Sequence, residues 1–174
     1  LQKKQKSILI KMLNNNTKKI IGIDPGYDRL GVSILEKKNN EYTICFSTCL
    51  TSDKKDGVNE RIFKLTKEVK KIINIYEPKE MSIEKLFFTN NQKTAMGVAE
   101  TRGALIFLAK DLDLKIFEYT PLQIKSALTG YGKADKNQVN FMLNQIFKFK
   151  DKTKKLDDEY DAIAVGYTHL ISTK

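Results

Sequence analysis

The sequence predicts an α/β domain in which a mixed five-stranded sheet is covered by helices on both faces. In the first third of the chain, β-branched and apolar runs are separated by short turns, which is typical of an antiparallel meander. Segments with helical apolar spacing then alternate with short apolar runs, as in strands joined by helical crossovers. With 174 residues and 41% hydrophobic residues, the chain is long enough for one domain with a buried core.

The first predicted strand, residues 18–24, is a β-branched run that stops at a Pro-Gly turn signal. Residues 27–31 form a turn into a second strand at 31–35, and a polar hairpin loop at 37–40 leads to a third strand at 42–50. Cys45 and Cys49 lie four residues apart in that third strand, so we expect them to share a face. We interpret them as reduced packing residues of an intracellular protein rather than a disulfide or a zinc site.

Helical periodicity begins at Val58, where apolar residues follow one face and lysines the other, and it ends before Pro78. A right-handed crossover through this helix returns the chain beside its start, so the first and fourth strands are expected to be neighbours. Gly97 and Gly103 in the second helix are expected to allow close packing against a neighbour. The predicted elements of this part are helices at 58–76, 95–112, 121–128, 136–147 and 157–171, with strands at 81–84 and 114–119.

The chain carries a formal net charge of +10, which favours a polyanionic partner such as nucleic acid or an anionic membrane surface. No apolar run is long enough to span a bilayer and no signal peptide is recognisable, so we expect a cytoplasmic protein without a membrane partner. Residues 1–17 are basic and lack periodicity, so we expect a disordered tail, with Met12 a candidate natural start, ahead of one domain at 18–174.

Carboxylates occur where the predicted elements would bring them together. Asp24 ends the first strand, Glu84 ends the fourth, and Asp158 and Asp161 lie three apart on one face of the last helix. Asp157 and Asp161, four apart, share a face as well. Clustered carboxylates repel one another unless divalent cations neutralise them, and oxygen ligands suit Mg²⁺ or Mn²⁺. Two such ions about 4 Å apart serve phosphodiester hydrolysis, so the positive charge and the carboxylates together indicate a nuclease.

A purely structural interpretation of the same carboxylates stays open on spacing alone. Acidic residues at 157–159 suit the N-terminal end of a helix dipole without any metal. Glu84 can equally be a solvent-facing strand end.

Six short motifs in fixed order resemble the bacterial RuvC Holliday-junction resolvases, and the resemblance runs from about residue 18 to residue 169. It implies an RNase H-like fold with a mixed five-stranded sheet. It also implies a homodimeric endonuclease that uses Mg²⁺, with Mn²⁺ as a substitute and two ions per site. Such an enzyme makes paired symmetric nicks in four-way DNA junctions during recombination and repair. The motifs are Gly-Ile-Asp-Pro-Gly (22–26), Ile-Glu-Lys-Leu-Phe (83–87), Arg-Gly (102–103), Phe-Glu-Tyr with Gln-Ile-Lys (117–119, 123–125), Gly-Tyr-Gly-Lys-Ala-Asp-Lys (130–136) and Asp-Glu-Tyr-Asp-Ala (158–162).

Carried over motif by motif, the resemblance makes Asp24, Glu84, Asp158 and Asp161 the catalytic, metal-binding carboxylates, with Asp158 preferred to Asp157. Phe87, rather than Phe88, matches an aromatic that the family inserts at the junction crossover, where an exposed ring can stack on an unpaired base. We interpret His169 as a helix-end residue and not a ligand, and helices 58–76 and 95–112 as dimer helices. The expected DNA-binding residues are Phe87, Arg102, Lys125, Lys133 and Lys136.

The carboxylate site contains no placed Ser, Tyr or Cys nucleophile. We therefore expect direct attack by metal-activated water, which leaves 5′-phosphate ends without a covalent enzyme intermediate. The branch-migration helicase complex is a candidate partner through the resemblance.

Other functions remain open at this point. One is an RNase H-like nuclease on other branched nucleic acids, which differs in substrate only and is distinguished by cleavage symmetry. Another is a junction-binding protein that does not cut, although a pure binder gains nothing from repulsive carboxylates that face DNA. An actin-like phosphotransferase would need a second glycine-rich phosphate loop and a longer chain.

Overall fold

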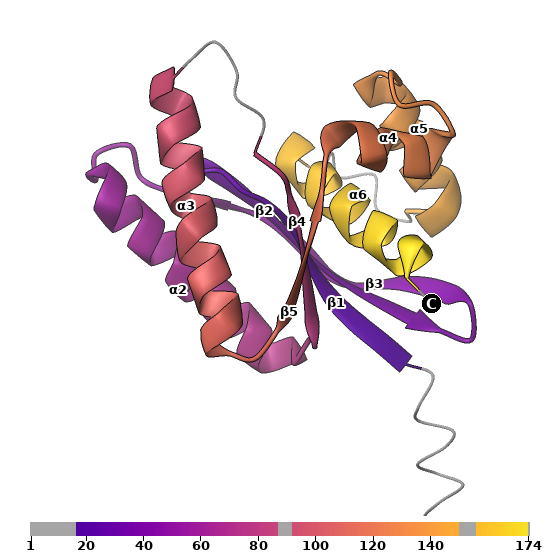
Figure 1. The fold of residues 1–174 in the computed structure, drawn as a ribbon, viewed down its shortest axis with the longest axis horizontal. Helices are drawn as coiled ribbons and strands as arrows, with labels where there is room; N and C mark the ends of the chain where they lie inside the picture. The colour runs from indigo at the N-terminus through magenta and orange to yellow at the C-terminus, as the bar shows by residue number, and fades with distance from the viewer. Residues whose placement is uncertain (1–16, 87–91, 150–155, 174) are drawn as a thin grey trace, which may run out of the picture.

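The computed structural model describes residues 17–86, 92–149 and 156–173, which form one layered domain around a five-stranded sheet. The strand order is β3-β2-β1-β4-β5 (Figure 1). The first three strands are antiparallel neighbours, whereas β4 pairs in parallel with β1 and β5 in parallel with β4. The meander, the mixed sheet and the β1–β4 pairing are thereby confirmed. The strands are β1 (Thr17–Asp24), β2 (Arg29–Lys38), β3 (Glu41–Thr51), β4 (Glu80–Glu84) and β5 (Lys115–Tyr119).

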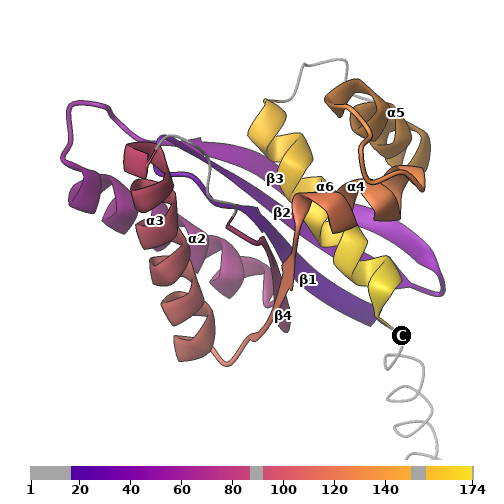
Figure 2. The ribbon, with the colours of Figure 1, turned by 45° about the horizontal axis from the view of Figure 1, so that its top comes forward.

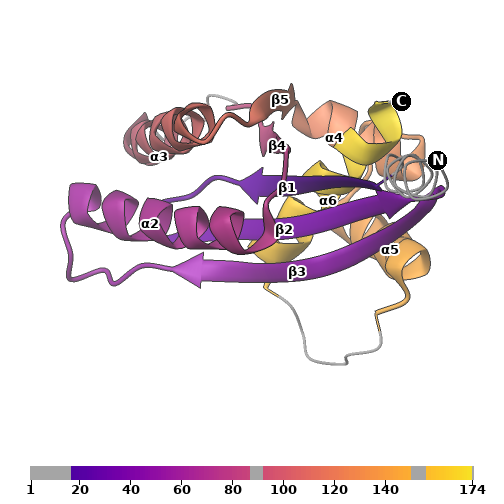
Figure 3. The same cartoon turned by 90° about the horizontal axis from the view of Figure 1, so that it is seen from below.

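The second strand is longer at both ends than the sequence predicts. Asn39 and Asn40 both have left-handed backbone angles, with φ of 50° and 64°, so the hairpin needs only two turn residues. At the other end, the ladder between β1 and β2 extends to the pair Asp24 and Gly31. The strand therefore begins at Arg29, inside the segment predicted as a turn. Figure 3 shows this long, twisted hairpin from below.

A β-bulge in β3 changes the expected faces of the two cysteines. Ile34 pairs with Phe46 while Leu35 pairs with Ile44, so Cys45 is the extra residue on its strand. Cys45 is consequently exposed and Cys49 partly buried, and both thiols are free. The prediction of free thiols is confirmed, but the prediction that both pack on one face is wrong for Cys45, because a bulge breaks the two-residue alternation.

One face of the sheet is covered by α2 (Val58–Tyr76) and α3 (Gln92–Asp111) (Figure 1). Their apolar sides enclose a core with side chains such as Val32, Leu65 and Leu105. On α3, Gly97 lies against the ring of Tyr27, as close packing requires. A Cβ at Gly103 would meet no atom of the described chain within 4 Å. The prediction of close packing is thus confirmed for Gly97 and wrong for Gly103 within this chain.

The other face is covered by α4 (Pro121–Thr129), α5 (Lys136–Phe147) and α6 (Asp157–Ser172) (Figure 2). Both α4 and α5 begin with a capping box, formed by Thr120 with Gln123 and by Asp135 with Gln138. The apolar sides of the three helices pack on the sheet in a second core. Helices on both faces were predicted, and the structure confirms them.

His169 lies in the last turn of α6, as the sequence predicts, and its side chain is completely buried. Its Nε2 lies 2.6 Å from Glu80 Oε2 and its Nδ1 lies 2.8 Å from the hydroxyl of Tyr119. Lys18 Nζ lies 2.8 Å from the same Glu80 oxygen and donates a 2.8 Å hydrogen bond to Thr173 Oγ1. This network holds the C-terminal end of α6 against the starts of β1 and β4. The helix α6 therefore runs antiparallel to β1.

The predicted basic tail falls almost wholly on residues 1–16, which lie outside the described residues, whereas Thr17 already belongs to β1. Across the described ranges, the helices are all too short or too polar to cross a membrane.

Candidate active site

Two of the expected carboxylates lie side by side because of the pairing of β1 and β4. Ile23 is opposite Ile83 in this parallel ladder, so the next residues, Asp24 and Glu84, end the two strands at the same edge of the sheet. The buried isoleucines fix the register, because a slip of one residue would turn them away from the core.

Small residues on the first two strands let α6 lie directly on the sheet beside Asp24. A Cβ on Gly31, the ladder partner of Asp24, would overlap the carbonyl oxygen of Asp158. A Cβ on Gly22 would overlap the carbonyl oxygen of Ala162, which also accepts a 2.8 Å hydrogen bond from the buried Ser33 hydroxyl. The first turns of α6 therefore rest on backbone rather than on side chains. This contact brings the carboxylates of α6 to the edge where Asp24 and Glu84 end.

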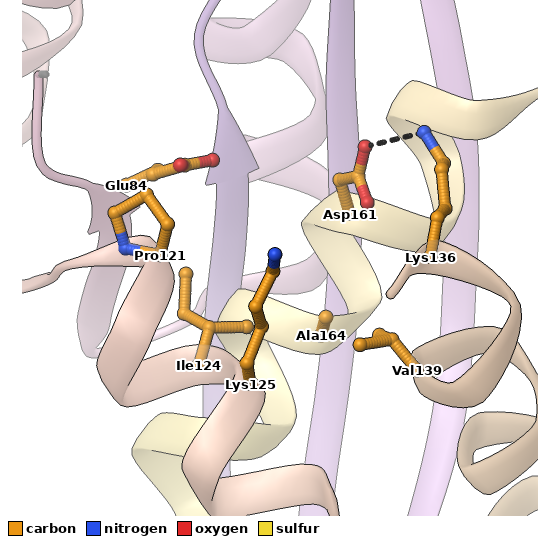
Figure 4. Close-up of a pocket in the computed structure, with 8 residues that line it drawn as sticks. All are labelled: Glu84, Pro121, Ile124, Lys125, Lys136, Val139, Asp161 and Ala164. Carbon is orange, nitrogen blue, oxygen red and sulfur yellow. Dashed lines mark hydrogen bonds and ion pairs between the residues drawn. The ribbon is translucent and has the colours of Figure 1, made fainter. Parts of the chain in front are cut away.

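A cleft of about 240 Å³ opens at this edge beside the α4–α5 pair, and of the four expected carboxylates it is lined by Glu84 and Asp161 (Figure 4). Glu84 lies on one side of it and Asp161 on the other, and Lys125 of α4 extends into the space between them. The remaining lining side chains are mostly apolar, so the charged groups act in a partly desolvated setting. They are Pro121, Ile124, Val139 and Ala164, together with Lys136.

The electrostatics show that the carboxylates act on one another. Burial, followed by the negative charges of Glu84, Asp161 and Asp158, raises the pKa of Asp24 to about 8. Burial and the charge of Asp161 raise the pKa of Glu84 to about 7, while Lys125 opposes this rise. The pKa of Asp161 is also raised, by burial first, with Lys136 opposing. Removing several protons from such a site is costly unless a cation compensates the charge.

Three of the α6 carboxylates, Asp157, Asp158 and Asp161, also have a cationic neighbour. Lys136 Nζ lies 3.1 Å from Asp161 Oδ2 and 3.5 Å from Asp157 Oδ2. Arg29 Nε lies 3.1 Å from Asp158 Oδ2, which Cys49 Sγ approaches to 3.9 Å. The Asp158 side chain is 18% exposed, compared with 61% for Asp157. Asp158, which the family resemblance favours over Asp157, is therefore also the more enclosed of the two side chains.

The donor chemistry of the site fits a hard divalent cation. The candidate ligands supply only oxygen atoms, as a hard cation requires; they are Asp24, Glu84 and Asp161. Burial and mutual repulsion raise their pKa values, so ionising them costs free energy, and a bound cation would lower that cost. Among the described residues, no three His, Cys, Asp or Glu side chains already converge as a metal cluster.

The expected DNA-binding residues fall into different places. Lys125 and Lys136 both line the cleft, whereas Lys133 is exposed in the turn between α4 and α5, outside the lining. The guanidinium of Arg102 pairs with Glu118, and its Nε donates a 3.4 Å hydrogen bond to the carbonyl of Glu84. Arg102 thus braces the end of β4, and its contact with DNA stays a prediction. Phe87 and its neighbour Phe88 lie outside the described residues.

Sequence reasoning missed several parts of the site. Arg29 lies within the segment taken for a turn, although its place two residues before Gly31 puts it at the rim. Cys49, predicted to be a packing residue, also approaches Asp158, and this contact depends on where α6 lies rather than on the local pattern of β3. The apolar walls from Ile124 and Val139 come from helix faces that are recognisable in the sequence, but their convergence depends on how α4 and α5 pack.

The sequence model described as "Crossover junction endodeoxyribonuclease RuvC" matches residues 20–169. The chain belongs to the RuvC family. Curated relatives include RuvC of Finegoldia magna, which is 40% identical over 156 residues that cover 90% of this chain and 94% of the relative. RuvC of Petrotoga mobilis is 39% identical over 150 residues that cover 86% and 91%. The family resemblance drawn from the six motifs is confirmed, and with it the nuclease class.

Solved structures agree with the fold. Thermus thermophilus RuvC in complex with a Holliday junction substrate superposes with a TM-score of 0.82 at 25% identity, covering 89% of this chain and 94% of that one. A second Thermus thermophilus RuvC structure gives a TM-score of 0.79 at 24% identity, covering 87% and 93%, and supports the fold alone. The prediction of the RuvC-type layered fold is thereby confirmed.

Proposed function

We propose that this chain is a Holliday-junction resolvase, a metal-dependent endonuclease that makes paired symmetric nicks in four-way DNA junctions. The observation that carries this proposal is the convergence of Asp24, Glu84 and the α6 carboxylates beside a lysine-bearing cleft. Membership of the RuvC family supports the substrate, because a relative of similar structure has been solved with a Holliday junction.

The chemistry is divided between the carboxylates and the lysines. Asp24, Glu84, Asp158 and Asp161 would hold the cation, and their oxygen-only donor set favours Mg²⁺, with Mn²⁺ as a substitute and two ions per site. When bound, such a cation supplies Lewis-acid stabilisation of the phosphate and lowers the pKa of a water molecule. Lys125 and Lys136 lie where they can offset the negative charge of a phosphate that enters the cleft.

A covalent intermediate is disfavoured by the thiol closest to the site. Burial and the negative charge of Asp158 raise the pKa of Cys49 to about 11, so this thiol stays protonated at neutral pH and is a poor nucleophile. This supports direct attack by water, and 5′-phosphate ends stay the predicted product.

A homodimer formed through α2 and α3 would place two active sites on a junction that is itself two-fold. Phe63 on α2 and Phe107 on α3 are 60% and 74% exposed, and both line a groove between the two helices. Large exposed aromatic side chains of this kind are typical of a surface that is covered by a partner. A cytoplasmic location and docking to the branch-migration helicase complex stay predictions.

The test maps cuts on all four strands of a synthetic mobile junction on denaturing gels, with Mg²⁺ and with EDTA. Paired nicks at symmetry-related positions, made only with the metal, are the expected result. Equal cutting of flaps and RNA–DNA hybrids would instead support an RNase H-like nuclease on other branched nucleic acids. Tight junction binding without any cutting would support a non-cutting junction-binding protein.

A further inference from the structure

The short loop that follows Asp24 is held by a buried arginine from another layer of the molecule. Arg61 on α2 is 6% exposed, and its guanidinium pairs with Asp28 in the β1–β2 loop. The same guanidinium lies over the ring of Tyr27, with 4.9 Å from its central carbon to the ring centroid. A buried charge is tolerated only when its partners are well placed, so this contact has a defined geometry.

Ser52, just past the end of β3, completes the connection. Its hydroxyl accepts a 2.8 Å hydrogen bond from Arg61 Nε and donates a 2.6 Å hydrogen bond to the carbonyl of Tyr27. Its backbone N–H donates to the carbonyl of Asp28 at 3.1 Å. The backbone of the loop is thus fixed at two successive residues.

The third contact comes from α3. A Cβ at Gly97 would lie 2.6 Å from Cδ1 of the Tyr27 ring, so the ring fits there only because residue 97 is glycine. The ring therefore lies between the guanidinium of Arg61 and the backbone of α3. Ser52, Arg61 and Gly97 come from three different elements and converge on one four-residue loop.

We propose that Arg61 and Tyr27 are positioning residues that hold Asp24 against its carboxylate neighbours. Asp24 is three residues before Tyr27, at the point where β1 leaves the sheet, and the negative charges of Glu84 and Asp161 would push its carboxylate away once all three groups are ionised. A fixed loop opposes this displacement and keeps the carboxylate where a divalent cation can be shared. The inference rests on the proposed metal-binding role of Asp24.

The test compares Arg61→Gln with Lys64→Gln, which removes a positive charge from the same helix. Lys64 is a matched control because its ion pairs within the described ranges are with Asp56 and Glu60, away from the β1–β2 loop, and its side chain is 55% exposed. Arg61→Gln should fold, because its partner Asp28 is 50% exposed and can be hydrated. The measurements are the Mn²⁺ dissociation constant by electron paramagnetic resonance, the Mg²⁺ concentration for half-maximal cleavage, and junction affinity in EDTA.

We expect Arg61→Gln to weaken Mn²⁺ binding and raise the half-maximal Mg²⁺ concentration by about 10- to 100-fold, as is typical when the support of a ligand is removed. Junction affinity in EDTA should stay unchanged, and Lys64→Gln should match the wild type in all three measurements. Arg61→Lys keeps the positive charge but loses the planar guanidinium group with its several N–H donors. Its Mn²⁺ affinity should lie between those of the wild type and Arg61→Gln.

A second pair of variants guards against a folding defect in Arg61→Gln. Gly97→Ala should also weaken Mn²⁺ binding, because the new methyl group displaces the Tyr27 ring. The same substitution should have no further effect in a Tyr27→Ala background.

A folded Arg61→Gln protein with wild-type Mn²⁺ affinity would overturn the positioning role, even if its unfolding temperature is lower. A wild-type protein that binds Mn²⁺ but cuts no junction would instead overturn the proposed function, and the Mn²⁺ comparison would still decide the role of Arg61.

Discussion

Asp24 is a partly buried carboxylate whose neighbours are carboxylates as well. Its pKa of about 8 follows from burial and from three negative neighbours, with only Lys136 acting in the opposite direction. A side chain of this kind destabilises the folded protein when it ionises, so its presence points to a function that needs the charge.

Asp24→Asn should lower the cleavage rate by about 100-fold or more, because an amide is a much weaker ligand for a hard cation. It should preserve or improve junction binding in EDTA, since it removes a negative charge near the phosphate. Rates measured on a labelled junction, with affinities from gel shifts, check both points. A folded Asp24→Asn protein that no longer binds junctions would contradict this division of roles.

The stability of the metal-free protein should depend on pH through Asp24 and Glu84. In the unfolded chain both carboxyls titrate near pH 4, whereas in the folded protein their pKa values are about 8 and about 7. Between about pH 4 and pH 8 the folded state binds more protons than the unfolded chain. The free energy of unfolding therefore falls as the pH rises towards about 8 and then levels off.

Asp24→Asn should therefore have a higher Tm in EDTA than the wild type, and the difference should grow from about pH 5 to about pH 8.5. A gain of roughly 2–4 °C per kcal/mol of relieved repulsion is expected for a chain of this size. Thermal unfolding of both proteins across this range is the measurement. A difference that shrinks as the pH rises would show that Asp24 is not held in a repulsive site.

That the four carboxylates lie close enough to act on one another could be predicted from the sequence, because each lies near a strand or helix end within a short motif. The partners of these residues could not. Arg61 is 33 residues from Asp28 along the chain, and a lysine-rich sequence offers many other cations for any carboxylate. Whether a cation is buried against a given partner depends on packing, which local patterns do not contain.

At the scale of elements, the placement of α6 decides whether the site exists. Gly31 and Gly22 let its first turns lie on the backbone of β2 and β1, and the buried His169 network fixes its other end. The helix is thus held at both ends, with its carboxylates at one of them.

Gly31→Ala should lower the free energy of unfolding by about 1–3 kcal/mol, because the added methyl group would overlap the carbonyl oxygen of Asp158. It should also reduce cleavage, since α6 must move away from Asp24. Gly103→Ala, on an open part of α3, should instead be neutral or stabilising by up to about 1 kcal/mol. Urea unfolding of the two variants measures the contrast, and equal effects would contradict the role of the helix contact.

The order and type of the elements could be predicted from periodicity, but some details could not. The bulge at Cys45 depends on how β3 pairs with β2, and nothing in the local alternation marks it. Gly97 and Gly103 look alike in the sequence, yet only Gly97 meets a ring, because which side of α3 faces the β1–β2 loop is set by the tertiary fold.

At the scale of the whole molecule, we propose separate roles for the two faces of the sheet. The helices α4, α5 and α6 lie on one face and α2 and α3 on the other (Figure 1). The first face carries the cleft, and the second carries the exposed Phe63 and Phe107. Two copies joined through the second face would leave both clefts open to DNA.

Phe107→Lys should convert a dimer into a monomer without unfolding it, because the side chain is 74% exposed in one chain. Sedimentation equilibrium should give twice the 20.0 kDa chain mass for the wild type and a single chain mass for the variant. Phe141→Lys, which replaces a 60% exposed phenylalanine on α5, is the matched control and should stay dimeric. A monomeric wild type in the presence of junction DNA would contradict this interface.

Anomalous diffraction from crystals soaked in Mn²⁺ tests the proposed active site most directly. The expected result is anomalous density bounded by Asp24, Glu84 and the carboxylates of α6, and its loss in Asp24→Asn crystals. Mn²⁺ bound only elsewhere, or no density at this edge of the sheet at saturating metal, would contradict the assignment of these carboxylates as one metal site.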